Sequence, residues 1–231
     1  SVAVLFAMRL VPLVSNPELS PVDDLFWKSS ECREAQVQWV MTYYRDDSIN
    51  FLVRAHCPTT LARLVQFADP RKLYENDADQ SYRPLKKMIA EALIASIDKR
   101  SRGQTEIQQS AILALGLIGD SDEDEIDEDI RKALMDVEDL ADPQSRNFAV
   151  IALAHVGGRP GHGEGDAIAG AEQVRKALLQ KLARGQSQRK SWAGIGLGVL
   201  ESSLVDSSST GAVSSASAEA VRTSLSKSKS P

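Results

Sequence analysis

Residues 111–119 read AILALGLIG, and this stretch decides the fold. A related stretch, AVIALAHVG, begins at residue 149, and a more divergent one, AGIGLGVLE, begins at residue 193. Each is apolar around most of a helix, which predicts a helix that is buried on more than one side. Similar helical stretches that recur at intervals of about 40 residues are typical of stacked helix pairs. The sequence therefore predicts an α-helical repeat architecture.

Small residues interrupt these apolar stretches. Gly116, Gly196 and Gly198 fall inside the predicted helices, where glycine costs up to ~1 kcal/mol relative to alanine. We expect close approach of a neighbouring helix to offset that cost.

A second motif alternates with the first. It reads LKKMI from residue 85, IRKAL from 130, VRKAL from 174 and VRTSL from 221. After the first copy, apolar residues continue at positions 92, 93 and 97, which is the spacing of one helical face. This motif predicts an amphipathic outer helix. Neither helix of a pair can bury its apolar face alone, so stacking of neighbouring pairs completes the core.

Residues 142–157, DPQSRNFAVIALAHVG, together with the helix predicted at 174–178, resemble a HEAT repeat. Repeats of this family commonly place Asp-Pro between units, and a basic residue before an Ala-rich helix that ends in glycine. The resemblance covers roughly residues 83–202. It implies an all-α fold, a right-handed superhelical solenoid of stacked antiparallel helix pairs. Armadillo-type and other helical repeats are the alternatives within this fold class.

The chain divides into three regions by pattern. Residues 1–30 are punctuated by prolines and predict an irregular segment, in which the apolar stretch 2–14 is favoured as the first element of the fold over a targeting segment. Residues 31–204 carry the HEAT-like solenoid. Residues 205–231 are polar and of low complexity, with a degenerate last helix. An open last repeat favours a place in a larger chain or complex.

Composition narrows the classes of function. The formal net charge is −5, which argues against general nucleic-acid binding. The two cysteines, Cys32 and Cys57, make neither a disulfide framework nor a zinc cluster. The stretch 2–14 is shorter than the ~20 residues that a membrane span needs, so we expect no membrane span. We favour a cytoplasmic or nuclear location.

Three unusual loops join the helices within the predicted pairs. Residues 120–125 are acidic (DSDEDE), residues 157–165 are rich in glycine (GGRPGHGEG), and residues 202–217 are rich in serine. Equivalent loops of a solenoid project from one edge, which is often the binding edge. The glycine-rich loop lacks the Gly-Lys-Ser/Thr of a phosphate-binding loop, so we expect a flexible connection there. The serine-rich loop predicts a mobile segment.

The acidic loop resembles the start of a calcium-binding loop. Asp120, Asp122 and Asp124 fit its first, third and fifth positions. Glu125 stands where that loop needs glycine, and Arg131 stands where it needs glutamate. We therefore predict no metal site, and interpret these carboxylates as groups favoured near a helix start.

No catalytic constellation is recognisable. His56 and Cys57 are adjacent, which points their side chains in different directions. His155 occupies an apolar position of the motif and predicts a partly buried histidine with a local hydrogen bond, whereas His162 is expected to be exposed. The sequence predicts no catalytic residue, no cofactor and no enzymatic activity.

The basic residues of the second motif suggest a binding surface. Stacking would align them into what we call the basic ladder, near the concave face: Lys86, Lys87, Arg131, Lys132, Arg175, Lys176 and Arg222. Such a surface suits an acidic peptide, a phosphate backbone or anionic lipid. The alternative is the solvated side of an amphipathic helix, whose charge the acidic run 127–129 mutes locally.

These patterns favour a non-catalytic scaffold that binds another protein, either on the concave face or on the loop edge. The runner-up is an enzyme or a nucleic-acid binder, because HEAT-like repeats also occur in bilin lyases and DNA-repair glycosylases. Trp27, Trp39 and Trp192 all lie outside the basic motif, which weighs against a glycosylase.

Overall fold

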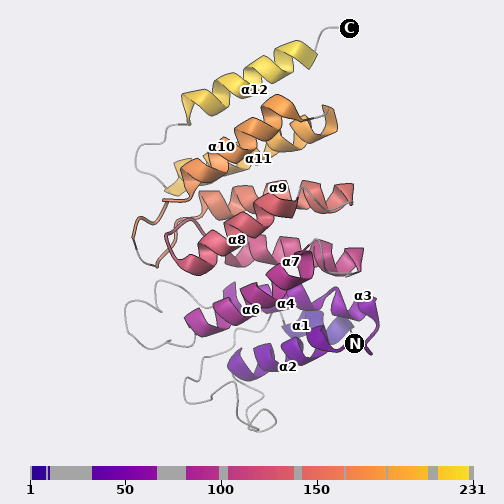
Figure 1. Ribbon diagram of the computed structural model, residues 1–231. Coiled ribbons are helices and arrows are strands. Elements are labelled where there is room, and N and C mark those ends of the chain that lie inside the picture. Colours follow the sequence, from indigo (N-terminus) through magenta and orange to yellow (C-terminus); the bar gives the residue numbers. More distant parts are fainter. Residues whose placement is uncertain are drawn as a thin grey trace. The chain divides into compact units, whose positions relative to one another are not determined.

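The computed structural model describes residues 2–8, 10, 33–66, 82–98, 104–137, 142–163, 165–185, 187–207 and 213–228. Every regular element in these ranges is an α-helix (Figure 1). The chain forms two compact units, Ser1–Ile118 and Gly119–Pro231. Within the described ranges, no helix has both the length and the apolar character to cross a membrane.

The first unit is built around a central helix. It contains α1 (Val2–Met8), α2 (Arg33–Arg45), α3 (Phe51–Arg54), α4 (Cys57–Gln66), α6 (Tyr82–Ile97) and α7 (Thr105–Ile118). Helix α4 contacts all the others, because its apolar side chains lie between α1 and α2 and the pair α6 and α7. The core is made of fully buried aliphatic side chains: Val37, Val40, Leu61, Val65, Ile89, Leu93, Ile112 and Leu115.

The apolar start of the chain is part of this unit. Helix α1 packs against α4, Leu5 is buried, and the Thr60 hydroxyl donates a hydrogen bond of 3.3 Å to the Leu5 carbonyl oxygen. The stretch favoured as a fold element therefore forms one over its described part. The rest of the predicted irregular segment, residues 11–30, lies outside the described residues.

The second unit contains α8 (Glu125–Asp136), α9 (Pro143–Gly158), α10 (Ala171–Arg184), α11 (Ser187–Ser207) and α12 (Ser215–Ser228). Helices α9 and α11 make the most extensive contact, α8 packs on α9, and α10 packs on both α9 and α11. The first motif lies in α7, α9 and α11, and the second lies in α6, α8, α10 and α12. The predicted alternation of helices is confirmed.

The Asp-Pro pair of the repeat starts α9. Asp142 is the N-cap, and its carboxylate accepts a 2.7 Å hydrogen bond from the Ser145 backbone N–H. Pro143 occupies the first helical position, where its missing N–H costs nothing. The local sequence thus fixes the helix start that positions the residues following it.

The prediction that glycines allow close helix packing is confirmed at Gly196 and is wrong at Gly198. A Cβ on Gly196 would lie 2.9 Å from Val150 Cγ1, and one on Gly157 would lie 2.7 Å from Val174 Cβ. A Cβ on Gly198 would meet nothing within 4 Å. Gly198 lies on an open side of α11, so close packing does not explain that glycine.

The C-terminal part of the chain is more helical than the sequence predicts. Helix α11 continues through Ser207 and α12 begins at Ser215, so most described residues of the predicted serine-rich loop are helical. The buried carboxylate of Glu201 holds the start of α12. It accepts hydrogen bonds from Arg175 Nε at 2.7 Å, the Ser217 hydroxyl at 2.6 Å and the Ser214 N–H at 3.1 Å.

Candidate anion-binding pocket

A pocket of about 390 Å³ lies among four helices of the second unit. This volume is near the lower end for sites that bind small ligands or side chains. The lining residues are Met135 from α8, Arg146, Asn147 and Val150 from α9, Ala177, Gln180, Lys181 and Arg184 from α10, the following Gly185, and Arg189 and Trp192 from α11. We call this the cationic pocket.

The charge of the lining has one sign. Among the described residues, the lining contains four cations, Arg146, Lys181, Arg184 and Arg189, and no carboxylate. Arg146 and Lys181 interact with other groups of the protein. Within the described part of the chain, the exposed side chains of Arg184 and Arg189 have neither an ion pair nor a hydrogen bond. A concave surface of this kind concentrates positive potential and attracts anions.

Helix ends bring partial charges of both signs to the lining. Arg146 and Asn147 lie near the start of α9, and Arg189 and Trp192 lie near the start of α11. The first turn of a helix carries partial positive charge, which at α9 is already matched by the capping carboxylate of Asp142. Lys181 and Arg184 lie in the last turn of α10, where a cation also stabilises its own helix. The charge of these two residues therefore serves the fold as well as the pocket.

Asn147 is a polar side chain inside the lining that lacks a partner. It is 8% exposed, and within the described residues its amide makes no hydrogen bond. The amide atoms are not among the fully buried side-chain atoms that lack a partner, so solvent reaches them and a bound ligand can take its place. Half-buried Trp192 and the apolar side chains of Met135 and Val150 offer a neighbouring surface to an apolar group.

Sequence reasoning missed this pocket because its cations do not repeat. Arg184 and Arg189 stand on either side of the Gly185 break between α10 and α11. A signal existed in the helical spacing: Ala177, Lys181 and Arg184 share one face of α10, and Arg189 and Trp192 share one face of α11. Only the packing of α8 to α11 brings these faces together.

The predicted basic ladder divides into internal and exposed residues. Lys86 and Lys87 lie in α6 of the first unit, and the others lie in α8, α10 and α12 of the second. Lys86, 5% exposed, has an interaction partner within the protein. Four members are exposed: Lys87, Lys132, Lys176 and Arg222. The Arg222 guanidinium Nη1 lies 3.7 Å from Glu219 Oε2. Binding by the ladder stays a prediction.

Two arginines of the ladder have clear internal roles. Arg131 is 4% exposed and donates hydrogen bonds of 2.8 and 2.9 Å to the carbonyl oxygens of Asp120 and Asp122. Arg175 pairs with Glu201 at 2.7 Å and with Glu172. The Glu201 hydrogen bond raises the pKa of Arg175 above its ordinary value, so the guanidinium stays charged. These contacts direct both guanidinium groups at the protein itself.

The acidic and glycine-rich loops are packed against each other. The Ser121 N–H donates to the Arg159 carbonyl oxygen at 3.0 Å, and the Gly170 N–H donates to the Ser121 carbonyl oxygen at 2.8 Å. The Gly163 N–H donates to Asp122 Oδ2 at 2.7 Å. We call these two segments, residues 119–124 and 157–170, the loop pair. The flexible connection predicted for the glycine-rich loop is wrong over its described residues.

Glycine is needed where the two loops touch. A Cβ on Gly161 would overlap the carboxylate of Asp122, and one on Gly163 would overlap that of Asp124. The backbone of Gly165 has a φ of 76°. Residues other than glycine adopt this left-handed conformation only at a cost in free energy. The glycines therefore allow contact between the loops, whereas the sequence pattern alone indicated only flexibility.

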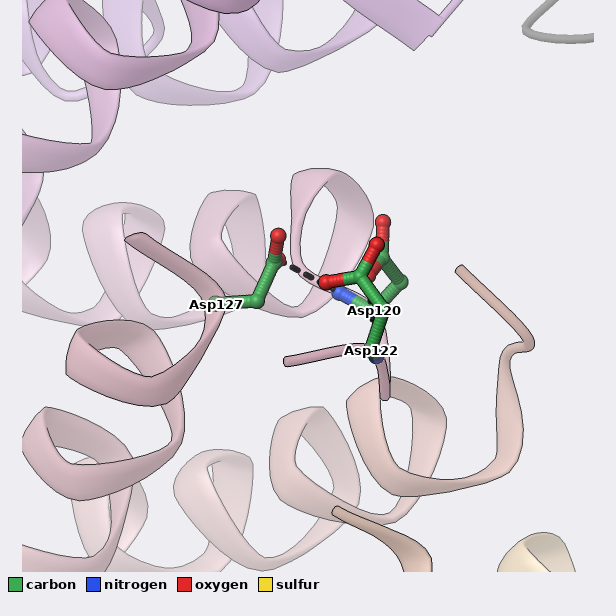
Figure 2. A group of neighbouring side chains, drawn as sticks. All are labelled: Asp120, Asp122 and Asp127. Carbon is green, nitrogen blue, oxygen red and sulfur yellow. Dashed lines mark hydrogen bonds between the residues drawn. The ribbon is translucent and has the colours of Figure 1, made fainter. Parts of the chain in front are cut away.

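Three carboxylates, two from the acidic loop and one from the first turn of α8, lie close together (Figure 2). The oxygens of Asp120, Asp122 and Asp127 lie within 4.8 Å of one another. Backbone groups occupy them: Asp127 Oδ1 accepts from the Asp120 N–H at 2.9 Å, and Asp122 Oδ1 accepts from the Asp124 N–H at 3.0 Å. The cluster thereby shapes the loop that Arg131 also holds.

The histidines and the described cysteine show no catalytic pairing. Burial raises the pKa of the Cys57 thiol to about 11, so it is protonated and unreactive at neutral pH. The His56 ring lies 5.3 Å from the Phe6 ring, centroid to centroid. His162 is exposed as predicted, and His155 keeps an exposed surface while burial of the rest of its side chain lowers its pKa. Cys32 lies outside the described residues.

Comparison of the chain with protein-family models, with curated proteins and with solved structures gives no match. The resemblance to HEAT repeats therefore stays a prediction that rests on the two alternating motifs.

Proposed function

We propose that the protein is a non-catalytic helical interaction module, and that its second unit binds an acidic segment of a partner protein in the cationic pocket. The observation that supports this most is the charge of the described lining residues, which include four cations and no carboxylate. Arg184 and Arg189 have exposed guanidinium groups with no partner in the described chain. An acidic segment would supply the missing charge, and its apolar side chains would pack beside Trp192.

The architecture that we propose is a right-handed superhelical solenoid of HEAT-like helix pairs. The alternation of buried and amphipathic helices supports it, as does the packing of α8 on α9 and of α9 on α11. In such an architecture each pair lends a short surface to a continuous binding face. The cationic pocket draws on helices of successive pairs, as a binding face of this kind requires.

The distribution of charge favours a protein partner over nucleic acid. Nucleic-acid binding needs a basic footprint along a strand, whereas this chain has a net charge of −5. In the second unit, the exposed carboxylates of Glu123, Glu125, Glu128 and Asp129 would repel a phosphate backbone. A bounded pocket of about 390 Å³ suits a short acidic segment.

The chemistry of the lining supports a binding role. Its ionisable members are arginine and lysine, which hold their protons at neutral pH and so are poor general bases. The shifted pKa values of Tyr44 and Cys57 belong to buried groups of the first unit and arise chiefly from burial. We therefore propose no reaction.

A second candidate uses the basic ladder. Lys132 and Lys176 are exposed, so an acidic peptide or a nucleic acid could bind there. This candidate includes the alternative that the protein binds nucleic acid. A matched pair of variants distinguishes binding at the ladder from binding in the pocket.

The test compares two double variants with the same change of charge. The first variant, Arg184→Gln with Arg189→Gln, alters the pocket. The second, Lys132→Gln with Lys176→Gln, alters the ladder. All four side chains are exposed. The probe is a pool of degenerate peptides rich in Asp, Glu and aromatic residues, with binding followed by fluorescence polarisation. The pocket variant should lose binding and the ladder variant should keep it. The reverse pattern would support the ladder and overturn the pocket.

A further inference from the structure

We infer that the anion held in the cationic pocket is a phosphorylated side chain of the partner protein, bound by Arg184, Arg189 and Asn147. This inference rests on the proposed function and specifies the chemistry of the same site. It adds to that function a dependence on modification of the partner.

The first argument is charge. Two guanidinium groups of the lining have no partner in the described chain, and two further cations lie beside them. A carboxylate brings one negative charge and two oxygens, whereas a phosphomonoester brings about −1.5 to −2 charges and three acceptor oxygens. One phosphate group can therefore neutralise both free guanidinium groups, while one carboxylate leaves one of them unpaired.

The second argument is the type of cation. Three of the four lining cations are arginines. The planar guanidinium fork donates two parallel hydrogen bonds to a phosphate or carboxylate, whereas lysine acts as a point charge. Clusters of arginine are the usual means of phosphate recognition in proteins.

The third argument is the side-chain amide of Asn147. It is 8% exposed, lies in the lining and has no hydrogen bond within the described residues. Arg146, its neighbour in α9, is also in the lining. The amide can donate to the third phosphate oxygen once the guanidinium groups hold the other two. A phosphate group would thereby satisfy a polar group that the fold leaves without a partner.

The test uses the full chain and matched peptide pools. Each pool has degenerate flanking residues and differs only at a central phosphoserine, phosphothreonine, phosphotyrosine, glutamate or serine. At a fixed ionic strength near 0.15 M, we expect a phosphorylated pool to bind about tenfold more tightly than the glutamate pool. Arg184→Gln with Arg189→Gln should abolish this difference, and Lys132→Gln with Lys176→Gln should keep it.

Further variants separate the effect of guanidinium geometry on phosphate binding from the effect of positive charge. Arg184→Lys with Arg189→Lys keeps the charge and should lose most of the preference for phosphate. Asn147→Ala should lower the affinity for the phosphorylated pool more than the affinity for the glutamate pool. Circular dichroism and thermal unfolding of each variant establish that it is folded.

The other outcomes separate this inference from the proposed function. If the glutamate pool binds as tightly as the phosphorylated pools and depends on the same arginines, the phosphate inference is overturned and the proposed function stands. If no pool binds to a folded protein, both are overturned. Both are overturned as well if a single-stranded oligonucleotide binds through Arg184 and Arg189 more tightly than every peptide pool.

Discussion

The backbone N–H of Gly163 donates a hydrogen bond of 2.7 Å to Asp122 Oδ2, across 41 positions of the sequence. This bond joins the acidic loop before α8 to the glycine-rich loop after α9. The Arg131 guanidinium holds the same acidic loop through two of its carbonyl oxygens. The loop pair is thus an ordered structure that fixes how α8 and α9 meet.

Replacement of Gly163 by alanine should loosen the loop pair. The added Cβ would overlap the carboxylate of Asp124 and displace the loop from Asp122. We expect the free energy of unfolding to fall by about 1–3 kcal/mol, measured by urea denaturation. Gly194→Ala is the control, since a Cβ there meets nothing within 4 Å. Equal stability of Gly163→Ala and the parent protein would contradict the close contact.

Replacement of Arg131 by methionine should destabilise the protein. The change keeps an unbranched chain in place of the aliphatic part of arginine but leaves two carbonyl oxygens without their donors, at a cost of about 2 kcal/mol. Lys132→Met, at an exposed neighbouring position, should change the unfolding free energy by less than about 0.5 kcal/mol. Thermal and urea unfolding of both variants measure the difference. If the two variants are equally stable, Arg131 does not have the structural role described.

Replacement of two glycines of α11 by alanine should change the stability of the protein in opposite directions. In Gly196→Ala the Cβ would press on Val150 Cγ1 at 2.9 Å, and we expect a loss of about 1–3 kcal/mol. In Gly198→Ala the Cβ meets nothing within 4 Å, and the helix gains up to ~1 kcal/mol. Denaturant unfolding of the two single variants gives both values. A gain in stability for Gly196→Ala would contradict the packing of α9 against α11.

Docking of α12 should weaken in acid. Burial by itself raises the pKa of Glu201, but hydrogen bonds from Arg175, Ser217 and Ser214 outweigh it and hold the pKa below the ordinary value of 4.5. The stabilisation from this carboxylate is therefore complete above pH 4.5 and is lost as the pH falls through the lowered value. Protection of the α12 amides against hydrogen exchange should fall over that range.

The control for this prediction is a second glutamate near the same helix. Glu201→Gln should reduce protection of α12 already at pH 7, because the charged partner of Arg175 is lost. Glu219→Gln, at a position 71% exposed, should leave it unchanged. If α12 is equally protected in Glu201→Gln and in the parent protein, the carboxylate does not hold that helix.

Helices were predictable from the sequence because their signal is local. The apolar spacing after residue 85 and the Asp142-Pro143 start depend on neighbours within one or two turns, and α6 and α9 form where these signals stand. Pro58 lies in the first turn of α4, which begins at Cys57, where a proline is tolerated. Such features need no knowledge of tertiary contacts.

The pocket and the loop pair were not predictable for the opposite reason. Arg146, Lys181 and Arg189 meet only because three helices pack together, and no repeat of the sequence links them. Gly163 is constrained by Asp122, which lies 41 positions away. The serine-rich region looked mobile because its composition does not show that Ser214 and Ser217 bond the buried carboxylate of Glu201.

The central claim is that the cationic pocket binds an acidic segment of a partner protein. The most direct measurement is an ¹⁵N NMR titration of the full chain with the acidic peptide pool and its phosphorylated counterpart. We predict shifts at the Trp192 indole N–H, the Asn147 side-chain amide and the backbone amides of Arg184 and Arg189, with Lys132 and Lys176 unchanged. Shifts confined to Lys132, Lys176 or the loop pair, or no shift at millimolar peptide, would contradict the claim.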